Sequence, residues 1–135
     1  MHPLLRQYVY EKMQAMHLLQ DAHTAHLNTF AEYVAKWRAA MFDGQYLEAL
    51  TAFETEQENF RAAMDWALDG PAVTTSAQMA IDLCEFWDVR SQSYEGEYYM
   101  TRIVDAGVEG ALLAQVLCWR SRFRYRLGVI EQSLV

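Results

Sequence analysis

The stretch LNTFAEYVAKWRAAM, from Leu27 to Met41, carries the clearest structural pattern in the sequence. Its apolar side chains recur in alternating steps of three and four residues, at Leu27, Phe30, Val34, Trp37 and Met41. This spacing places them on one face of an α-helix and leaves the polar residues on the other face. The stretch therefore predicts an amphipathic helix that packs against a core.

Similar patterns on both sides of this stretch predict further helices, separated by turn residues. Asp43-Gly44, Asp69-Gly70-Pro71, and Gly107 with Gly110 interrupt the periodicity. No segment shows the sustained alternation of a strand, so we expect an all-α fold of antiparallel helix hairpins. The expected helices are 2–19, one capped by Asp21, 45–68, one opened by a Thr75/Gln78 capping box, one starting at Ser93, 111–127, and a stub 129–135 after a turn at Gly128.

The periodicity also indicates which side chains face inward. In the first helix, Leu5, Tyr8 or Val9, Met13 and Met16 share one face, which predicts an amphipathic helix. Cys84 and Cys118 lie in apolar periodic segments, where a reduced thiol serves as a small hydrophobe. The other expected core positions are Leu47, Leu50, Phe53, Phe60, Met64, Ala67, Ala80 or Ile81, Trp87, Tyr98 or Tyr99, Ile103 and Val104, with Trp37, Trp66 and Trp119 also mostly in the core.

Composition and charge narrow the class of protein. The 135 residues are 53% hydrophobic and carry a net charge of −7. This acidic balance opposes binding to DNA phosphates or to an anionic membrane surface. No apolar run approaches the roughly 20 residues that span a bilayer. We therefore expect a cytoplasmic protein without a direct nucleic-acid or membrane partner.

Three blocks of sequence carry a family resemblance. They are HPLLRQY at 2–8, together with His26 before Phe30; EQENFRAAMDWAL at 56–68; and Phe86-Trp87 with Arg90, followed by Glu95-Gly96. These blocks resemble the helical segment that joins the ATPase core to the tetratricopeptide (TPR) array in STAND-class ATPase transcriptional regulators of bacteria. The positions that match the family pattern are Glu56, Asn59, Arg61, Trp66, Trp87, Glu95 and Gly96. Glu56 and Asn59, three residues apart, are expected to help orient a neighbouring helix.

The resemblance implies one helical domain, 1–135, in a right-handed TPR-like superhelix. Residues 1–20 would follow a winged-helix subdomain, 21–107 would form linker hairpins, and 109–135 would be a truncated first TPR-like repeat. Residues 117–133 have the helix-turn-helix spacing of such a repeat, with Ser121 at its small packing position. The chain is then expected to be a fragment of a longer protein. Two departures stand out: Ser91 replaces a usual Gly, and Arg120 and Arg124 replace apolar repeat positions.

The polar clusters in the sequence are explained as helix-surface residues, without catalysis or metal binding. His23 and His26 lack the further ligands that a metal needs, and Glu54, Glu56 and Glu58 are too far apart around a helix to converge. The arginines between 120 and 126 are expected to balance the acidic helices of the same chain. The sequence contains no Walker lysine loop and no recognisable nucleophile motif. We therefore expect no catalytic residue, no cofactor and no metal site.

The expected function is a non-catalytic helical adaptor or sensor segment of a STAND-type regulator, acting through protein contact. Its partner would be the rest of the parent regulator, or a second copy bound through the C-terminal helices. The residues expected at that surface are Leu113, Leu117, Arg120, Arg124, Ile130 and Leu134. The alternative is a free-standing helical bundle that binds a small molecule or a metal.

Overall fold

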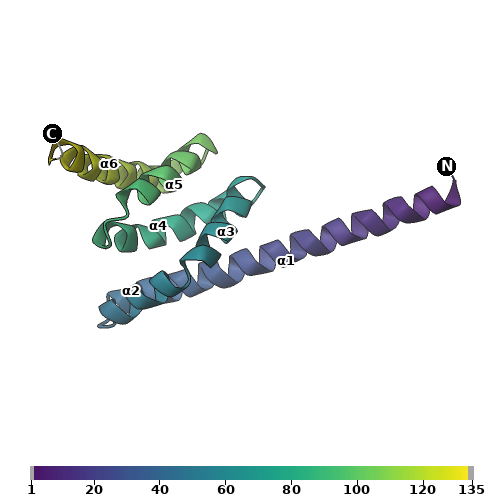
Figure 1. Ribbon diagram of the computed structural model, residues 1–135, viewed down its shortest axis with the longest axis horizontal. Coiled ribbons are helices and arrows are strands. Elements are labelled where there is room, and N and C mark those ends of the chain that lie inside the picture. Colours follow the sequence, from purple (N-terminus) through teal and green to yellow (C-terminus); the bar gives the residue numbers. More distant parts are fainter. Residues whose placement is uncertain (1, 134–135) are drawn as a thin grey trace.

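A computed structural model describes residues 2–133, which form six α-helices and no β-strand within that range. The helices are α1 (Pro3–Met41), α2 (Tyr46–Thr55), α3 (Gln57–Leu68), α4 (Val73–Val89), α5 (Ser93–Asp105) and α6 (Gly110–Ser133). α2 doubles back on α1, α3 continues from α2 after a bend, and from α4 onward each helix doubles back on the one before it (Figure 1). The prediction of an all-α fold is confirmed.

α1 is a single helix of 39 residues, so the expected break before Asp21 is wrong. The helix starts where expected: Pro3 occupies the first turn, and the His2 ring accepts a hydrogen bond from the Leu4 N–H at 3.2 Å. After Pro3 the helix contains no further Pro and no Gly, so nothing interrupts its hydrogen bonds. One exposed Asp inside a helix costs less than about 1 kcal/mol, which is too little to end it.

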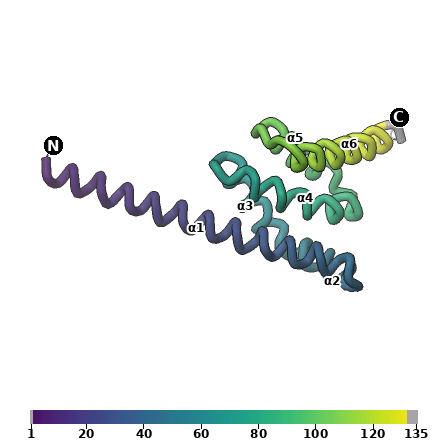
Figure 2. Tube along the Cα trace, turned by 180° about the vertical axis from the view of Figure 1, so that it is seen from behind, coloured from purple at the N-terminus to yellow at the C-terminus, as the bar shows by residue number. Residues whose placement is uncertain are grey.

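The two halves of α1 differ in their surroundings. In the second half, Leu27, Val34 and Met41 are buried, as the sequence predicts. The first half projects away from the other helices in both views (Figures 1 and 2). Its apolar side chains, including Leu5, Val9 and Met16, are exposed to solvent.

The segment from 45 to 68 was expected to be one helix, but it is divided at Glu56 into α2 and α3. Thr51 and Thr55 donate hydrogen bonds to the carbonyls four residues earlier, at 3.1 and 2.9 Å. Such bonds compete with the helix backbone and bend it. The bend lets both helices pack on α1. Leu47 was expected in the core and is 70% exposed, whereas the other inward positions of this segment are buried.

α4 is the central helix and packs against α1, α3, α5 and α6. It begins at Val73 with no side-chain cap, so the expected Thr75/Gln78 capping box does not form. Its buried residues are Ser76, Ala77, Met79, Ala80, Ile81, Leu83, Cys84, Phe86 and Trp87. Phe53 of α2 lies between Phe60 and Phe86, with ring centroids at 5.9 and 5.6 Å in edge-to-face geometry.

The turn residues act as expected at most helix ends. Gly44 and Gly107 have positive φ angles of 87° and 90°, which only glycine adopts without strain. Asp69-Gly70-Pro71 follows the end of α3, but Gly70 does not adopt the left-handed conformation expected of it. Ser91 does adopt it, with φ 58°, at the end of α4.

α6 runs from Gly110 to Ser133 through Gly128, so the expected turn at Gly128 is wrong. A single glycine inside a helix costs about 1 kcal/mol relative to alanine, and it ends the helix only where other signals join it. The helix-turn-helix expected over 117–133 is therefore one continuous helix, and Ser121 is exposed on it. Val116 and Phe123 are the fully buried residues of α6. No helix among the described residues is long and apolar enough to cross a membrane.

Candidate functional site

Arg61 and Glu95, both expected to be structural, form an ion pair that joins α3 to α5. The Arg61 Nε lies 2.6 Å from one Glu95 oxygen, and its second nitrogen lies 2.9 Å from the other. Glu58 and Gln57 accept the remaining hydrogen bonds of the guanidinium at 2.6 and 3.1 Å. The bond to Glu95 raises the pKa of Arg61 further above its usual value. Bidentate geometry fixes both side chains and makes this contact stronger than an ordinary surface pair.

A second connection between the same helices was not predicted. Asp65 of α3 accepts hydrogen bonds from the Tyr99 hydroxyl at 2.9 Å and from Arg102 at 2.7 Å, and Arg102 also reaches Asp69 at 3.2 Å. Burial, and then the hydrogen bond to Asp65, raise the pKa of Tyr99. We call these residues and the pair above the α3–α5 seam: Arg61, Asp65, Asp69, Glu95, Tyr99 and Arg102. The signal that could have revealed it is the four-residue spacing of Arg61, Asp65 and Asp69.

The order of the contacts gives the direction of the two helices. Arg61 contacts Glu95, and Asp65, one turn later, contacts Arg102. α3 and α5 therefore run in the same direction. Each Arg of the seam lies opposite an acid of the other helix. A shift of α5 that brought Glu95 opposite Asp65 would place like charges together, so the seam disfavours that register.

Gly96 and Trp87 extend this seam to α6 and α4. A Cβ atom placed on Gly96 would lie 2.5 Å from the Phe123 ring, which is fully buried. At Gly96 the Phe123 ring of α6 therefore packs directly against the backbone of α5. Trp87 is buried and stacks on Tyr99 with centroids 5.6 Å apart and an interplanar angle of 5°. The expectation that Trp87 faces inward is confirmed.

Glu56 and Asn59 hydrogen-bond to each other at 2.6 Å and are not bound to a neighbouring helix. Their location explains the difference, because Glu56 is the residue at which α2 ends and α3 begins. The pair steadies the bend between these helices. Trp66 is half-buried and stacks on His23 of α1 at 5.1 Å, so this contact attaches α1 to α3.

Three arginines of α6 are paired with acids of the same chain, as expected from the acidic balance. Arg124 contacts Glu97 at 3.1 Å, while Arg122 and Arg126 both contact Asp88 of α4, at 3.0 and 2.7 Å. The side chain of Asp88 is only 6% exposed. These pairs hold α6 against α4 and α5. Because the charges of the three arginines are balanced within the chain, they attract an acidic partner less strongly.

The C-terminal contact residues spread along α6. Leu117 is 37% exposed and Ile130 is 41% exposed, while Leu113 and Arg120 are half-buried. Arg124 is exposed and paired, and Leu134 lies outside the described residues. Cys118 is exposed, so its expected role as a small core hydrophobe is wrong, whereas Cys84 is buried.

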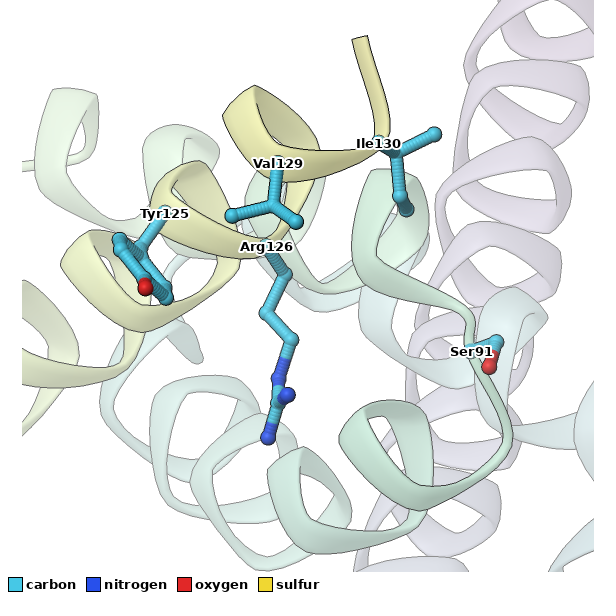
Figure 3. Close-up of a pocket in the computed structure, with 5 residues that line it drawn as sticks. All are labelled: Ser91, Tyr125, Arg126, Val129 and Ile130. Atoms are coloured by element: carbon cyan, nitrogen blue, oxygen red, sulfur yellow. The ribbon is translucent and has the colours of Figure 1, made fainter. Parts of the chain in front are cut away.

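A hollow of about 420 Å³ lies between the end of α4 and the last turns of α6. Ser91, Tyr125, Arg126, Val129 and Ile130 line it (Figure 3). Arg126 points away from α6, and its guanidinium is bound to Asp88. Val129 and Ile130 make part of the lining apolar, and the charge of Arg126 is balanced by Asp88. Such a lining suits contact with a protein side chain.

The histidines do not converge. His23 stacks on Trp66, and His26 lies 4.8 Å from the Phe30 ring in a tilted arrangement. Within residues 2–133, no group of three His, Cys, Asp or Glu side chains could hold a metal ion.

We compared the chain with protein families, with curated proteins and with solved structures. No family model, curated protein or solved structure matches it.

Proposed function

We propose that this chain is a non-catalytic helical adaptor of a STAND-type regulator, which acts in the cytoplasm through protein contact. Its helix hairpins would form part of a right-handed TPR-like superhelix. The proposal is supported by the sequence resemblance and by the place where the resembling residues meet. Arg61, Trp87, Glu95 and Gly96 come from three different helices and lie around one seam.

The observation that carries the proposal is the connection of α3 to α6 through that seam. Arg61 links α3 to α5 with two hydrogen bonds. One residue further along, Gly96 lets Phe123 of α6 lie directly against α5. A displacement of α3 would therefore be carried to α6 by one ion pair and one ring contact. Such a connection is what a relay between two ends of a helical array requires.

The outer surface of α6 is the proposed receiving surface. Leu117 is more than one third exposed on it, and the hollow lined by Tyr125 and Ile130 adds an apolar recess beside the end of α4. The proposed partner is a helical part of the parent regulator. Arg120, which is half-buried, would orient an acidic residue of that partner.

The relay can be tested by hydrogen exchange in two matched variants. Arg61→Met removes the pair with Glu95 at 2.6 Å, and Arg90→Met removes a pair with Glu54 at 2.7 Å. The two arginines are similarly exposed, at 36% and 40%, but Arg90 joins α4 to α2. We expect Arg61→Met to speed backbone exchange several-fold in both α5 and α6, and Arg90→Met to leave α6 unchanged. Unchanged exchange in α6 of the Arg61 variant, with faster exchange in α5, would refute the relay.

A further inference from the structure

We call helices α2 to α6 the body of the molecule. The second half of α1 packs on the body through α2, α3 and α4, and the exposed half, residues 3–22, continues the same helix face. In the packed half, this face carries Leu27 and Val34, which are buried. Steps of three and four residues backward along it lead through His23 and Gln20 to Met16, Met13 and Val9. The exposed apolar stripe is therefore an extension of an established interface, and it begins where the body ends.

Its area is sufficient for a weak specific dimer. Six large apolar side chains on or beside this stripe are 40–59% exposed. With roughly 200 Å² for a large side chain, each offers about 100 Å², so two copies would bury on the order of 1,200 Å². That is the lower limit of stable specific interfaces. These six side chains are Leu5, Tyr8, Val9, Met13, Met16 and Leu19.

The position of the body determines the orientation of a partner helix. In a parallel pair, both copies would direct the face around Leu27 toward each other, yet each face is already covered by its own body. An antiparallel pair avoids this clash because the two bodies lie at opposite ends. α1 starts at Pro3, and its contact with the body starts at the His23–Trp66 stack. The stripe residues Val9, Met13 and Met16 are centred near residue 13, so a two-fold axis near Met13 lays the stripe of one copy along the stripe of the other.

We propose that two copies of this chain associate through an antiparallel pair of α1 helices, along the stripe of Val9, Met13 and Met16. Charge does not oppose this arrangement, since the exposed half contains Arg6 and Lys12 against Glu11 and Asp21 and is thus neutral when its one histidine is neutral. The proposal is independent of the adaptor function.

Sedimentation equilibrium from 1 to 500 μM tests the surface. Met16→Glu places a charge in the stripe, whereas Leu18→Glu makes the same kind of change on the opposite side, because residue 18 is nine residues, or two and a half turns, after Val9. Both side chains are more than half exposed, so neither change should unfold the chain. We expect a reversible dimer that Met16→Glu weakens at least tenfold and Leu18→Glu leaves intact.

Leu117→Glu distinguishes the C-terminal surface, because Leu117 lies on α6 and not on the stripe. A dimer that survives this change supports the proposal. A strict monomer throughout the range, a dimer indifferent to Met16→Glu, or a dimer lost in Leu117→Glu would each overturn it.

Cysteine cross-linking tests the orientation in a Cys118→Ser background, which removes the exposed thiol. Met13→Cys lies near the proposed axis and should form a disulfide-linked dimer under mild oxidation. Leu5→Cys lies eight residues from the axis, so the two copies of it would be about 24 Å apart along the helix and should not cross-link. In a parallel pair each residue of the stripe lies opposite its own copy, so linkage through residue 5 as efficient as linkage through residue 13 would show a parallel pair and overturn the proposed orientation.

Discussion

Replacing Gly96 with alanine would test the packing of α6 against α5 directly. The new Cβ would lie 2.5 to 2.7 Å from three atoms of the Phe123 ring. Real Cβ contacts are essentially never this short, and Phe123 is fully buried, so the ring must shift against its packed neighbours. Overpacking of this kind costs about 1–3 kcal/mol. Alanine also gains up to about 1 kcal/mol over glycine within a helix, which leaves a net loss of about 0–2 kcal/mol.

The chain provides a matched control at Gly128. It is also inside a helix, but a Cβ there meets nothing within 4 Å. Gly128→Ala should therefore stabilise by about 0.5–1 kcal/mol, since only the helix propensity changes. Urea unfolding of both variants would measure the contrast. Phe123→Leu in the Gly96→Ala background should recover part of the loss, because a smaller side chain leaves room for the methyl group. If Gly96→Ala stabilised the chain as much as Gly128→Ala, the close approach of α5 and α6 would be refuted.

Four further predictions follow from individual residues. Trp87→Ala should lower the unfolding free energy by about 3–5 kcal/mol in urea titrations, because Trp87 is only 2% exposed; a loss below about 1 kcal/mol would contradict its packing on Tyr99. Ser91→Gly should stabilise by about 0.5–1 kcal/mol in the same assay, since Ser91 has φ 58° and glycine removes that strain. Burial raises the pKa of Asp82, because the buried site favours the neutral, protonated carboxyl over the charged one. The stability that the protonated form contributes is lost as the pH rises through the pKa of the folded state. Asp82→Asn should therefore stabilise at pH 7 with a margin that shrinks toward zero below about pH 4, as thermal melts across pH would show. Neither ATP with magnesium nor zinc should raise the melting temperature, and a saturable shift with either ligand would favour a ligand-binding bundle over the adaptor.

Sequence periodicity predicted the inward faces well but not the lengths of the helices. Phe53, Phe60, Cys84 and Trp87 are buried as expected, because the faces of a helix follow from local spacing alone. Asp21 and Gly128, in contrast, were expected to mark helix boundaries and lie inside helices. A residue of low helix propensity costs at most about 1 kcal/mol, and a long helix with good neighbours tolerates that.

The candidate site was predictable in its members but not in its pairing. Arg61 and Glu95 were both selected from the sequence, yet their ion pair spans 34 residues and requires α3 and α5 to lie side by side. Asp65 and Tyr99 were missed as partners because each suits a helix surface equally well in isolation. The left-handed conformation of Ser91, with φ 58°, was likewise not predicted.

Contacts between helices join the exposed half of α1 to the outer surface of α6 without interruption. α1 is one helix about 58 Å long, so its exposed tip and its packed half move together. His23 of α1 stacks on Trp66 of α3. Arg61, a little more than one turn before Trp66 on α3, binds Glu95 of α5. Gly96 then brings Phe123 of α6 against α5. A partner bound to the stripe on α1 would thus press on the same helix that the Arg61 pair connects to α6. Spatial continuity alone does not establish coupling. Exchange in α6, compared between the monomer and the dimer and between Arg61→Met and Arg90→Met, would measure it.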